Sequence, residues 1–140
     1  MAIEQLEHGA DLSLRITATT VEQAFEQAAH GLFSLMLDVV TVQPRETYTF
    51  HLEAPGHEEL LVEWLSDLLA QKELTGLVFS RFEVRIASIE TGLGLDGKAS
   101  GERLNPKSHS PKIEVKGISY LGLRVRGRRG RWMVQFVVDV

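Results

Sequence analysis

The chain has 140 residues, of which 44% are hydrophobic and 24% are charged, and its formal net charge at pH 7 is −4. A chain of this size and composition normally folds as one globular domain, so residues 1–140 are expected to form a single soluble domain. The absence of cysteine excludes a disulfide scaffold, a thiolate zinc site, an iron–sulfur cluster and a cysteine nucleophile. No run of about 18 apolar residues could span a membrane. The N-terminus lacks the features of a signal peptide, so we expect a cytoplasmic protein.

The first half of the chain predicts two strand–helix units. Residues 11–17 alternate between apolar and polar side chains, which is the period of a half-buried strand. Thr20 can then cap a helix that should run to about Leu37, because apolar residues recur at every third or fourth position. A second alternating strand covers residues 47–53, and the helix that follows it should end at Gly76.

The second half of the chain is richer in strands. Residues 77–90 predict a long strand, whereas the glycine-rich stretch 92–97 is typical of a connection or an irregular strand. Two prolines bracket residues 105–111, so this stretch is expected to be a loop. The next strand should present one apolar face, made by Ile113, Val115, Leu121, Leu123 and Val125. The turn 127–130 connects it to a final strand over residues 131–140, which predicts a long antiparallel hairpin.

The order and number of these elements indicate the fold class. Two helices are too few to cover both faces of a sheet of about six strands. We therefore expect an α+β fold, a two-layer α/β sandwich in which a mixed, mostly antiparallel sheet packs against two main helices. No linker long enough to divide the chain into domains is present.

Acidic groups near both ends of the chain form the first candidate site. Asp139 precedes Val140, whose carboxylate is expected to be free, and Asp11 begins the first predicted strand. If the two strands are neighbours, three carboxyl groups could meet, with His8 near them, and hard oxygen ligands suit Ca²⁺, Mg²⁺ or Mn²⁺. The alternative is that Asp139 only solubilises a strand end and Asp11 marks a turn, because spacing does not fix the register that a metal site needs.

Basic residues supply a second set of candidates. Residues 124–131 hold five arginines and no acid, and Arg128 and Arg129 at the turn could contact RNA phosphates. A basic hairpin tip can equally protect a sheet edge from aggregation. Lys116 could bind an anion or could be an ordinary surface lysine. The four histidines other than His8, at positions 30, 51, 57 and 109, do not repeat at metal-ligand spacing, so they are expected to be structural or idle.

Several segments together resemble the archease family, in the family's order along the chain. They are residues 7–11 (EHGAD), 20–29 (TVEQAFEQAA), 76–79 (GLVF), Gly101-Glu102 leading to His109, 114–120 (EVKGISY) and 138–140 (VDV). The His-x-Ala-Asp start, the Glu-Val-Lys strand and the Asp one residue before the end are the most specific of these.

The resemblance implies an α/β sandwich protein that is no enzyme itself. Archeases activate the GTP-dependent RNA ligase that joins RNA ends bearing a 3′-phosphate or cyclic phosphate in tRNA splicing and RNA repair, and they promote its guanylylation and multiple turnover. RNA would be met through that ligase. The family's divalent-cation site, seen with calcium, corresponds to Asp11, Asp139 and Val140. The family's activating lysine corresponds to Lys116, and His8 belongs to the motif expected to contact the metal or the partner.

This sequence departs from the family pattern at three positions. Leu121 stands where family members usually have His, Gly9 where they have Thr, and Asn105 where they have Asp. Because Leu121 falls on the predicted apolar face, it is expected to extend the core. If the family's histidine serves the metal or the partner, that contribution is missing here.

Two other functions remain open from the sequence. A stand-alone metal-dependent phosphoester hydrolase would use the same carboxylates with His8 as the base, and it would act without a partner. No nucleophile elbow, phosphate loop or dinucleotide-binding pattern is present, which argues against a self-sufficient enzyme. An RNA-binding, chaperone-like module would use the arginine tip and would bind RNA in a salt-sensitive way without a ligase.

Overall fold

The computed structural model describes residues 2–8 and 11–140, except that the side chains of residues 6–8 and 11 lie outside this description. In chain order its elements are β1 (Ala2–His8), β2 (Asp11–Ala18), α1 (Val21–Met36), the 3₁₀ turn η1 (Val39–Thr41), β3 (Glu46–Ala54), α2 (His57–Thr75), β4 (Leu77–Ile89), β5 (Gly92–Arg103), α3 (Pro106–His109), β6 (Gly117–Arg128) and β7 (Arg131–Asp139). The first strand, β1, was not expected from the sequence. None of the described helices is long and apolar enough to cross a membrane.

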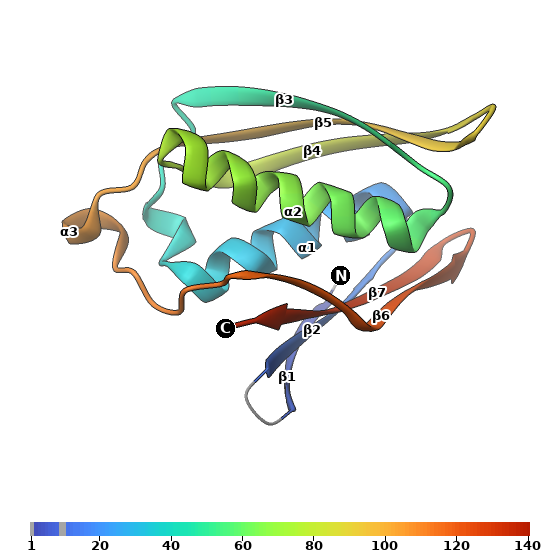
Figure 1. Cartoon of the computed structure of the whole chain (residues 1–140), viewed down its shortest axis with the longest axis horizontal. Coiled ribbons are helices and arrows are strands. Elements are labelled where there is room, and N and C mark those ends of the chain that lie inside the picture. The colour runs from blue at the N-terminus through green and yellow to red at the C-terminus, as the bar shows by residue number, and fades with distance from the viewer. Residues whose placement is uncertain (1, 9–10) are drawn as a thin grey trace.

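The strands form two separate antiparallel sheets with α1 and α2 between them (Figure 1). The first sheet has the strand order β1-β2-β7-β6, and the second has the order β3-β5-β4. Helix α1 packs against β4 of one sheet and against β2 and β7 of the other, while α2 packs against β3 and β5 on one side and β6 on the other. The predicted α+β sandwich with two main helices is confirmed, and the structure adds that two sheets enclose the helices.

Both main helices begin and end where the sequence predicts. The Thr20 hydroxyl accepts a hydrogen bond from the Gln23 N–H at 3.1 Å at the start of α1. Gly76 ends α2 with a φ of 75°, a left-handed conformation that glycine adopts without steric cost. The fully buried Trp64 of α2 donates a hydrogen bond of 3.1 Å from its indole N–H to the Phe25 carbonyl of α1. This bond ties the two helices together inside the common core.

Strand β5 corrects the expectation for residues 92–97. It is a continuous central strand of 12 residues that pairs with β3 on one side and with β4 on the other. Its glycines allow close packing, because a Cβ atom at Gly97 would lie 2.8 Å from the Trp64 ring and one at Gly101 would collide with the Val78 carbonyl. Glycine in this stretch therefore marks close approach of the strand to its neighbours and not a turn.

The stretch between the two prolines is only partly a loop, because Pro106–His109 form the single helical turn α3. The Asn105 side chain caps this turn by accepting a hydrogen bond from the Lys107 N–H at 3.0 Å. Pro106 occupies the first helical position, where no N–H donor is needed. Asn105 thus keeps the capping oxygen that an aspartate would supply, so this departure from the family pattern costs no cap.

The strand that follows is shorter than the sequence predicts. β6 begins only at Gly117, so Ile113 and Val115 lie outside it. Val115 is buried and Ile113 is 37% exposed, which means that the two residues do not share one apolar strand face.

Candidate functional site

The C-terminal end of β7 gathers the main chains of the residues that the sequence singles out. β7 lies between β2 and β6, where Leu12 pairs with the residue before Asp139 and Gly117 pairs with Asp139 itself. The Lys116 N–H donates a hydrogen bond of 2.8 Å to the Asp139 carbonyl. Since Asp11 directly precedes Leu12 in an antiparallel pair, its main chain lies at the same end of the sheet as Asp139.

The carboxylate of Asp139 is open to solvent at this strand end. Asp139 is exposed and Val140 is 41% exposed. The Asp139 Oδ2 atom lies 3.8 Å from the position that a Cβ atom would take at Gly117, so the carboxylate is directly beside this glycine of β6. The side chains of Asp11 and His8 lie outside the described residues. Among the side chains that are described, no group of three His, Asp or Glu could hold a metal ion. A site that includes Asp11 therefore stays a prediction.

Lys116 lies beside this strand end in a surface depression of about 570 Å³, between the C-terminal half of α2 and residues 114–118. Glu73 of α2 and Glu114 also line the depression. The Lys116 side chain is exposed, and the ion pairs found in the described part of the chain do not include it.

A bulge in β6 stands between this end and the hairpin turn. Ser119 pairs with Val137 and Arg124 pairs with Gln135, so residues 120–123 lie opposite a single residue of β7. The expectation that Leu121 extends the core is wrong, because its side chain is 79% exposed in this bulge. Tyr120 beside it is 66% exposed, so the bulge presents an aromatic and an aliphatic side chain to solvent.

The glycine of the bulge explains how these side chains reach the surface. Gly122 has a φ of 78°, and a Cβ atom there would lie 3.0 Å from Cγ2 of Val137. The bulge therefore folds over Val137, which is buried although it lies on the face of β7 directed away from the helices. Nothing in an apolar–polar alternation could have predicted this change of register.

Sequence reasoning missed a polar cluster around His109, which is 1% exposed. The His109 Nδ1 atom accepts a hydrogen bond from the Asn105 N–H at 2.9 Å, and its Nε2 atom lies 2.9 Å from Oε2 of Glu102. Since a backbone N–H can only donate, Nδ1 carries the lone pair and Nε2 donates to Glu102. Hydrogen bonds from the Gln43 N–H and from His109 hold the pKa of Glu102 below its usual value, and the charge of Arg45 contributes less.

This His109–Glu102 cluster ties the end of β5 and α3 to the segment before β3. The Gln43 N–H lies 2.8 Å from Oε2 of Glu102, and the Arg45 guanidinium lies 3.3 Å from Oε1 of the same residue. A depression of about 540 Å³ surrounds the cluster. Each partner in the cluster is already bonded to another protein group, which indicates a structural connection. The only signal in the sequence was the Gly-Glu and His of the family resemblance.

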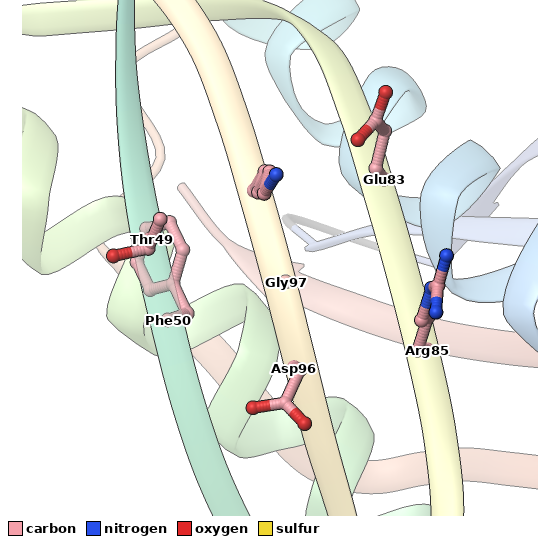
Figure 2. Close-up of a pocket in the computed structure, with 7 residues that line it drawn as sticks. Thr49, Phe50, Glu83, Arg85, Asp96 and Gly97 are labelled. Atoms are coloured by element: carbon pink, nitrogen blue, oxygen red, sulfur yellow. The ribbon is translucent and has the colours of Figure 1, made fainter.

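The outer face of the three-stranded sheet holds a further depression, of about 490 Å³, shown in Figure 2. Figure 2 shows Glu83 and Arg85 on β4, Asp96 on β5 and Thr49 on β3. His51 lies 2.8 Å from Asp96 and 3.2 Å from Glu53, and these two carboxylates raise the pKa of the His51 ring. Charges of both signs are interleaved on this face, which is typical of a solvated sheet surface and gives no convergent site.

The structure separates the predicted RNA-contacting arginines from the carboxylate end. Arg128 and Arg129 lie exposed at the β6–β7 turn, and Arg128 pairs with Arg131 at the start of β7. Asp139 is the last residue of the same strand. At about 3.3 Å per residue the two ends of β7 are about 27 Å apart. Figure 1 shows the C-terminus at the opposite end of β7 from this turn.

Comparison with protein families gives one match that spans nearly the whole chain. Residues 3–140 match the model of the Archease protein family (MTH1598/TM1083). The protein archease of Thermococcus kodakarensis is 44% identical over 138 residues, which is 98% of this chain and 97% of the relative. The protein archease of Methanopyrus kandleri is 36% identical over 140 residues and covers both chains completely.

Two solved structures have the same fold. The solution structure of Methanobacterium thermoautotrophicum protein 1598 superposes with a TM-score of 0.87 at 27% identity and covers 99% of this chain and 98% of that one. A crystal structure of an archease from Thermotoga maritima, described as a possible chaperone, has a TM-score of 0.62 at 16% identity and covers 98% of this chain and 96% of that one. The second likeness shows the fold alone.

Proposed function

The chain belongs to the archease family, and from this premise we propose that it is a cytoplasmic accessory protein that activates a GTP-dependent RNA ligase. The ligase joins RNA ends that carry a 3′-phosphate or cyclic phosphate, in tRNA splicing and RNA repair. The accessory protein promotes guanylylation of the ligase and its multiple turnover, and it supplies no nucleophile of its own.

One observation supports this proposal above the others. Strands β2 and β7 are neighbours, although 120 residues separate Leu12 from Trp132, the first residue of β7 that pairs with β2. Their register brings the main chains of Asp11 and Asp139 to one end of the sheet. The same end carries Lys116 through its hydrogen bond to Asp139. An acidic pair beside a lysine is a chemistry suited to a cation and a phosphate that meet at a partner's nucleotide site.

The residues that would hold a divalent cation are Asp11, Asp139 and the main-chain oxygens of Val140. All of them offer hard oxygen atoms, which suit Ca²⁺, Mg²⁺ or Mn²⁺ and not a thiophilic metal. Gly117 has no side chain beside the Asp139 carboxylate, so this position places no group of its own in the way of a ligand. A bound divalent cation supplies neutralisation of the negative charge that develops at a transferring phosphoryl or nucleotidyl group.

Lys116 and His8 are assigned to partner contact. The exposed Lys116 ammonium would pair with a phosphate or with a carboxylate of the ligase. His8 pairs through its main chain with Asp11 at the β1–β2 end, which places both family-motif residues on the same hairpin.

The test is ligation of an RNA with a 3′-phosphate by a small amount of ligase, with and without this protein. Stimulation of multiple turnover is expected for the natural chain, and it should fall to the level of ligase alone for Asp11→Asn and for Asp139→Asn. Asp96→Asn is the matched control, because Asp96 is an exposed strand aspartate on the other sheet. Calorimetric titration of the isolated variants with Ca²⁺, Mg²⁺ and Mn²⁺ gives a second readout. Full stimulation by both site variants would refute the proposed site, and phosphoester hydrolysis without ligase would favour the stand-alone hydrolase.

A chaperone-like activity is a second candidate. It is supported by the exposed Tyr120 and Leu121 of the β6 bulge, which present an aromatic and an aliphatic side chain to solvent. A chaperone would keep the ligase soluble during heating without changing its rate per folded molecule. An activator would raise the rate of ligase that is already fully soluble.

A further inference from the structure

Arginines cluster on the outer face of the four-stranded sheet, from the β6–β7 turn to the level of Gln135 in the middle of β7. They are Arg15 of β2, Arg131 of β7, and Arg124, Arg126 and Arg128 of β6, with Arg129 in the turn itself. Leu123 and Val125 alternate with the β6 arginines and pack toward the core, so these arginines project away from the helices. We call this set the arginine face.

The arginine face carries more positive charge than the acidic residue beside it offsets, because Glu4 of β1 stands opposite Arg15 while the β6 arginines pair with Gln135, Met133 and Arg131 of β7. The ion pairs among the described side chains involve Arg45, Lys72 and two histidines, and none of the arginines on this face. Arg128 and Arg131 even stand opposite each other as a cross-strand pair. Like charges directly opposite each other on a sheet are unfavourable. The arrangement becomes favourable when a polyanion lies across it.

Protection of a sheet edge does not account for this arrangement. An edge strand needs charges on its own side chains, and β6 is an edge strand of this sheet. Arg15 and Arg131, however, belong to β2 and β7, which lie inside the sheet. A positive patch that crosses three strands is a surface and not an edge.

We infer that the arginine face binds the phosphodiester backbone of RNA. Guanidinium groups donate paired hydrogen bonds to phosphate oxygens, and side chains two residues apart on a strand repeat about every 6.7 Å, so one strand can meet successive phosphates. Arg126, Arg128 and Arg131 line a surface depression of about 260 Å³ that suits a phosphate group. The choice of RNA among polyanions rests on the proposed function.

The hairpin that carries the arginine face is held rigid from its inner side. The Trp132 ring lies 5.2 Å from the His57 ring at the start of α2, and the Glu58 carboxylate accepts a hydrogen bond of 3.3 Å from the Val125 N–H. Gly127 lacks a side chain where a Cβ atom would collide with Trp132. The arginines are thus presented on a fixed framework, which lowers the entropy lost on binding.

Arg131 of the arginine face and the carboxylate of Asp139 lie at opposite ends of β7, so the two surfaces can contact different partners. Asp139 lies on the same side of β7 as Arg131, because odd-numbered residues alternate with the buried Val134, Phe136 and Val138. The carboxylate end would face the ligase nucleotide site, and the arginine face would hold the RNA about 27 Å away.

The experiment measures binding of a short fluorescent single-stranded RNA with a 3′-phosphate to the full chain, by anisotropy over a series of salt concentrations. The variant R126Q/R128Q/R131Q is expected to bind about tenfold more weakly or worse. Its slope of log affinity against log salt should be smaller by about 2, because single strands contribute about 0.7 for each phosphate neutralised. The variant R126K/R128K/R131K should keep the salt slope while losing affinity, since lysine keeps the charge without the paired donors.

The matched control is R81Q/R85Q/K98Q, which removes three exposed cations from the outer face of the other sheet. Its affinity for RNA should stay within twofold of the natural chain. Equal loss of binding in both triple variants would mean that net charge alone attracts RNA, and that result overturns the inference. Unchanged binding in R126Q/R128Q/R131Q overturns it as well.

Two further arms separate RNA binding from its alternatives. A polyglutamate peptide that displaces the RNA as well as unlabelled RNA does, at equal charge, would assign the face to an acidic protein and overturn the inference. Asp139→Asn should lose ligase stimulation and keep RNA binding. If no variant affects ligase stimulation while RNA binding still depends on the arginine face, the proposed function fails and the inference stands.

Discussion

Among the side chains that the structure describes, histidines form hydrogen bonds with carboxylates at two places, and burial decides what each contact contributes. His109 is 1% exposed and is bonded through both ring nitrogens, to Asn105 and to Glu102. His51 is exposed and its contacts with Asp96 and Glu53 compete with water. A buried polar group that loses its partner pays the full cost of desolvation, whereas an exposed group regains water.

Replacement of the buried ring should therefore destabilise the fold. His109→Ala is expected to lower the free energy of unfolding by about 2 kcal/mol, because it leaves the Asn105 N–H without its acceptor and removes a packed ring. His51→Ala, the exposed control, should leave the free energy of unfolding nearly unchanged. Urea unfolding followed by circular dichroism measures both, and equal losses in the two variants would contradict the structural assignment of His109.

The lowered pKa of Glu102 has a consequence for acid stability. The Gln43 N–H, then His109, then Arg45 favour the ionised carboxylate in the folded protein, so its pKa lies below the ordinary value of 4.5. The unfolded chain then binds more protons, and the stability that Glu102 contributes is present above pH 4.5 and is lost as the pH falls through the folded pKa. Unfolding between neutral and acidic pH should show a smaller acid-dependent loss for Glu102→Gln than for the natural chain. A parallel pH dependence in both would contradict this.

Glutamates of the helices close one edge of each sheet. β4 is an edge strand of the three-stranded sheet, and its Val84 N–H donates to the Glu26 carboxylate of α1 at 2.9 Å. β6 is an edge strand of the four-stranded sheet, and its Val125 N–H donates to Glu58 of α2 at 3.3 Å. Unpaired edge N–H groups are templates for aggregation, so each contact holds a helix and also occupies one N–H group of an edge strand.

Glu26 accepts the Val84 hydrogen bond in surroundings that disfavour its ionised carboxylate. Burial raises its pKa, with added repulsion from Glu83 and Glu22, while the Val84 hydrogen bond lowers it. The ionised form is thus disfavoured by folding, and the stability that Glu26 contributes falls as the pH rises past 4.5 toward its folded pKa. Glu26→Gln keeps the acceptor and should be as stable as the natural chain or more so at pH 7. Glu26→Ala should lose about 1–2 kcal/mol. Thermal unfolding with light scattering measures stability and aggregation. If Glu26→Gln were less stable than Glu26→Ala, the assignment of Glu26 as a hydrogen-bond acceptor for Val84 would be contradicted.

The elements that the sequence predicts well are those whose ends are fixed by residues close to them along the chain. α1 and α2 begin and end near their predicted residues because the Thr20 cap and Gly76 act locally. For residues 92–97 of β5 the sequence allows a connection or an irregular strand, because the contact that explains Gly97 is with Trp64, which is distant along the chain. The β2–β7 register joins residues at opposite ends of the sequence, and the bulge in β6 breaks the alternation. The candidate site could be listed from the sequence, but only long-range pairing could bring its residues together.

The glycines of β5 can be ranked by what a side chain would meet. A Cβ atom at Gly101 would collide with the backbone of Val78, which cannot move without breaking the sheet. A Cβ atom at Gly94 would lie 3.3 Å from Cγ2 of Ile89, a side-chain methyl group that has to move by only a few tenths of an ångström. Gly101→Ala should cost about 3 kcal/mol or prevent folding, and Gly94→Ala less than about 1 kcal/mol. Chemical unfolding of the two variants checks the order, and the reverse order would show that β5 packs differently.

At the scale of the whole molecule, strand β7 joins two surfaces of opposite charge. Arg131 of the arginine face is the first residue of β7, and Asp139 is its last. The Tyr120–Leu121 bulge of the neighbouring strand β6 lies between these two ends. The chain has a net charge of −4, so the positive end stands out against an acidic remainder. Such an asymmetric molecule aligns in the field of a charged partner before contact.

The two ends should act on different kinetic parameters of the ligase. R126Q/R128Q/R131Q weakens only RNA capture, so it should raise the RNA concentration needed for half-maximal stimulation about tenfold and leave the rate at saturating RNA unchanged. Asp139→Asn should lower the saturating rate and leave the half-maximal concentration unchanged. Because the ends are about 27 Å apart and share no side-chain partner, the combined variant should show the sum of both effects on a free-energy scale. Steady-state ligation over a series of RNA concentrations measures both parameters. A combined effect far from additive would mean that β7 transmits changes from one end to the other, and the two surfaces would then have to be treated as one site.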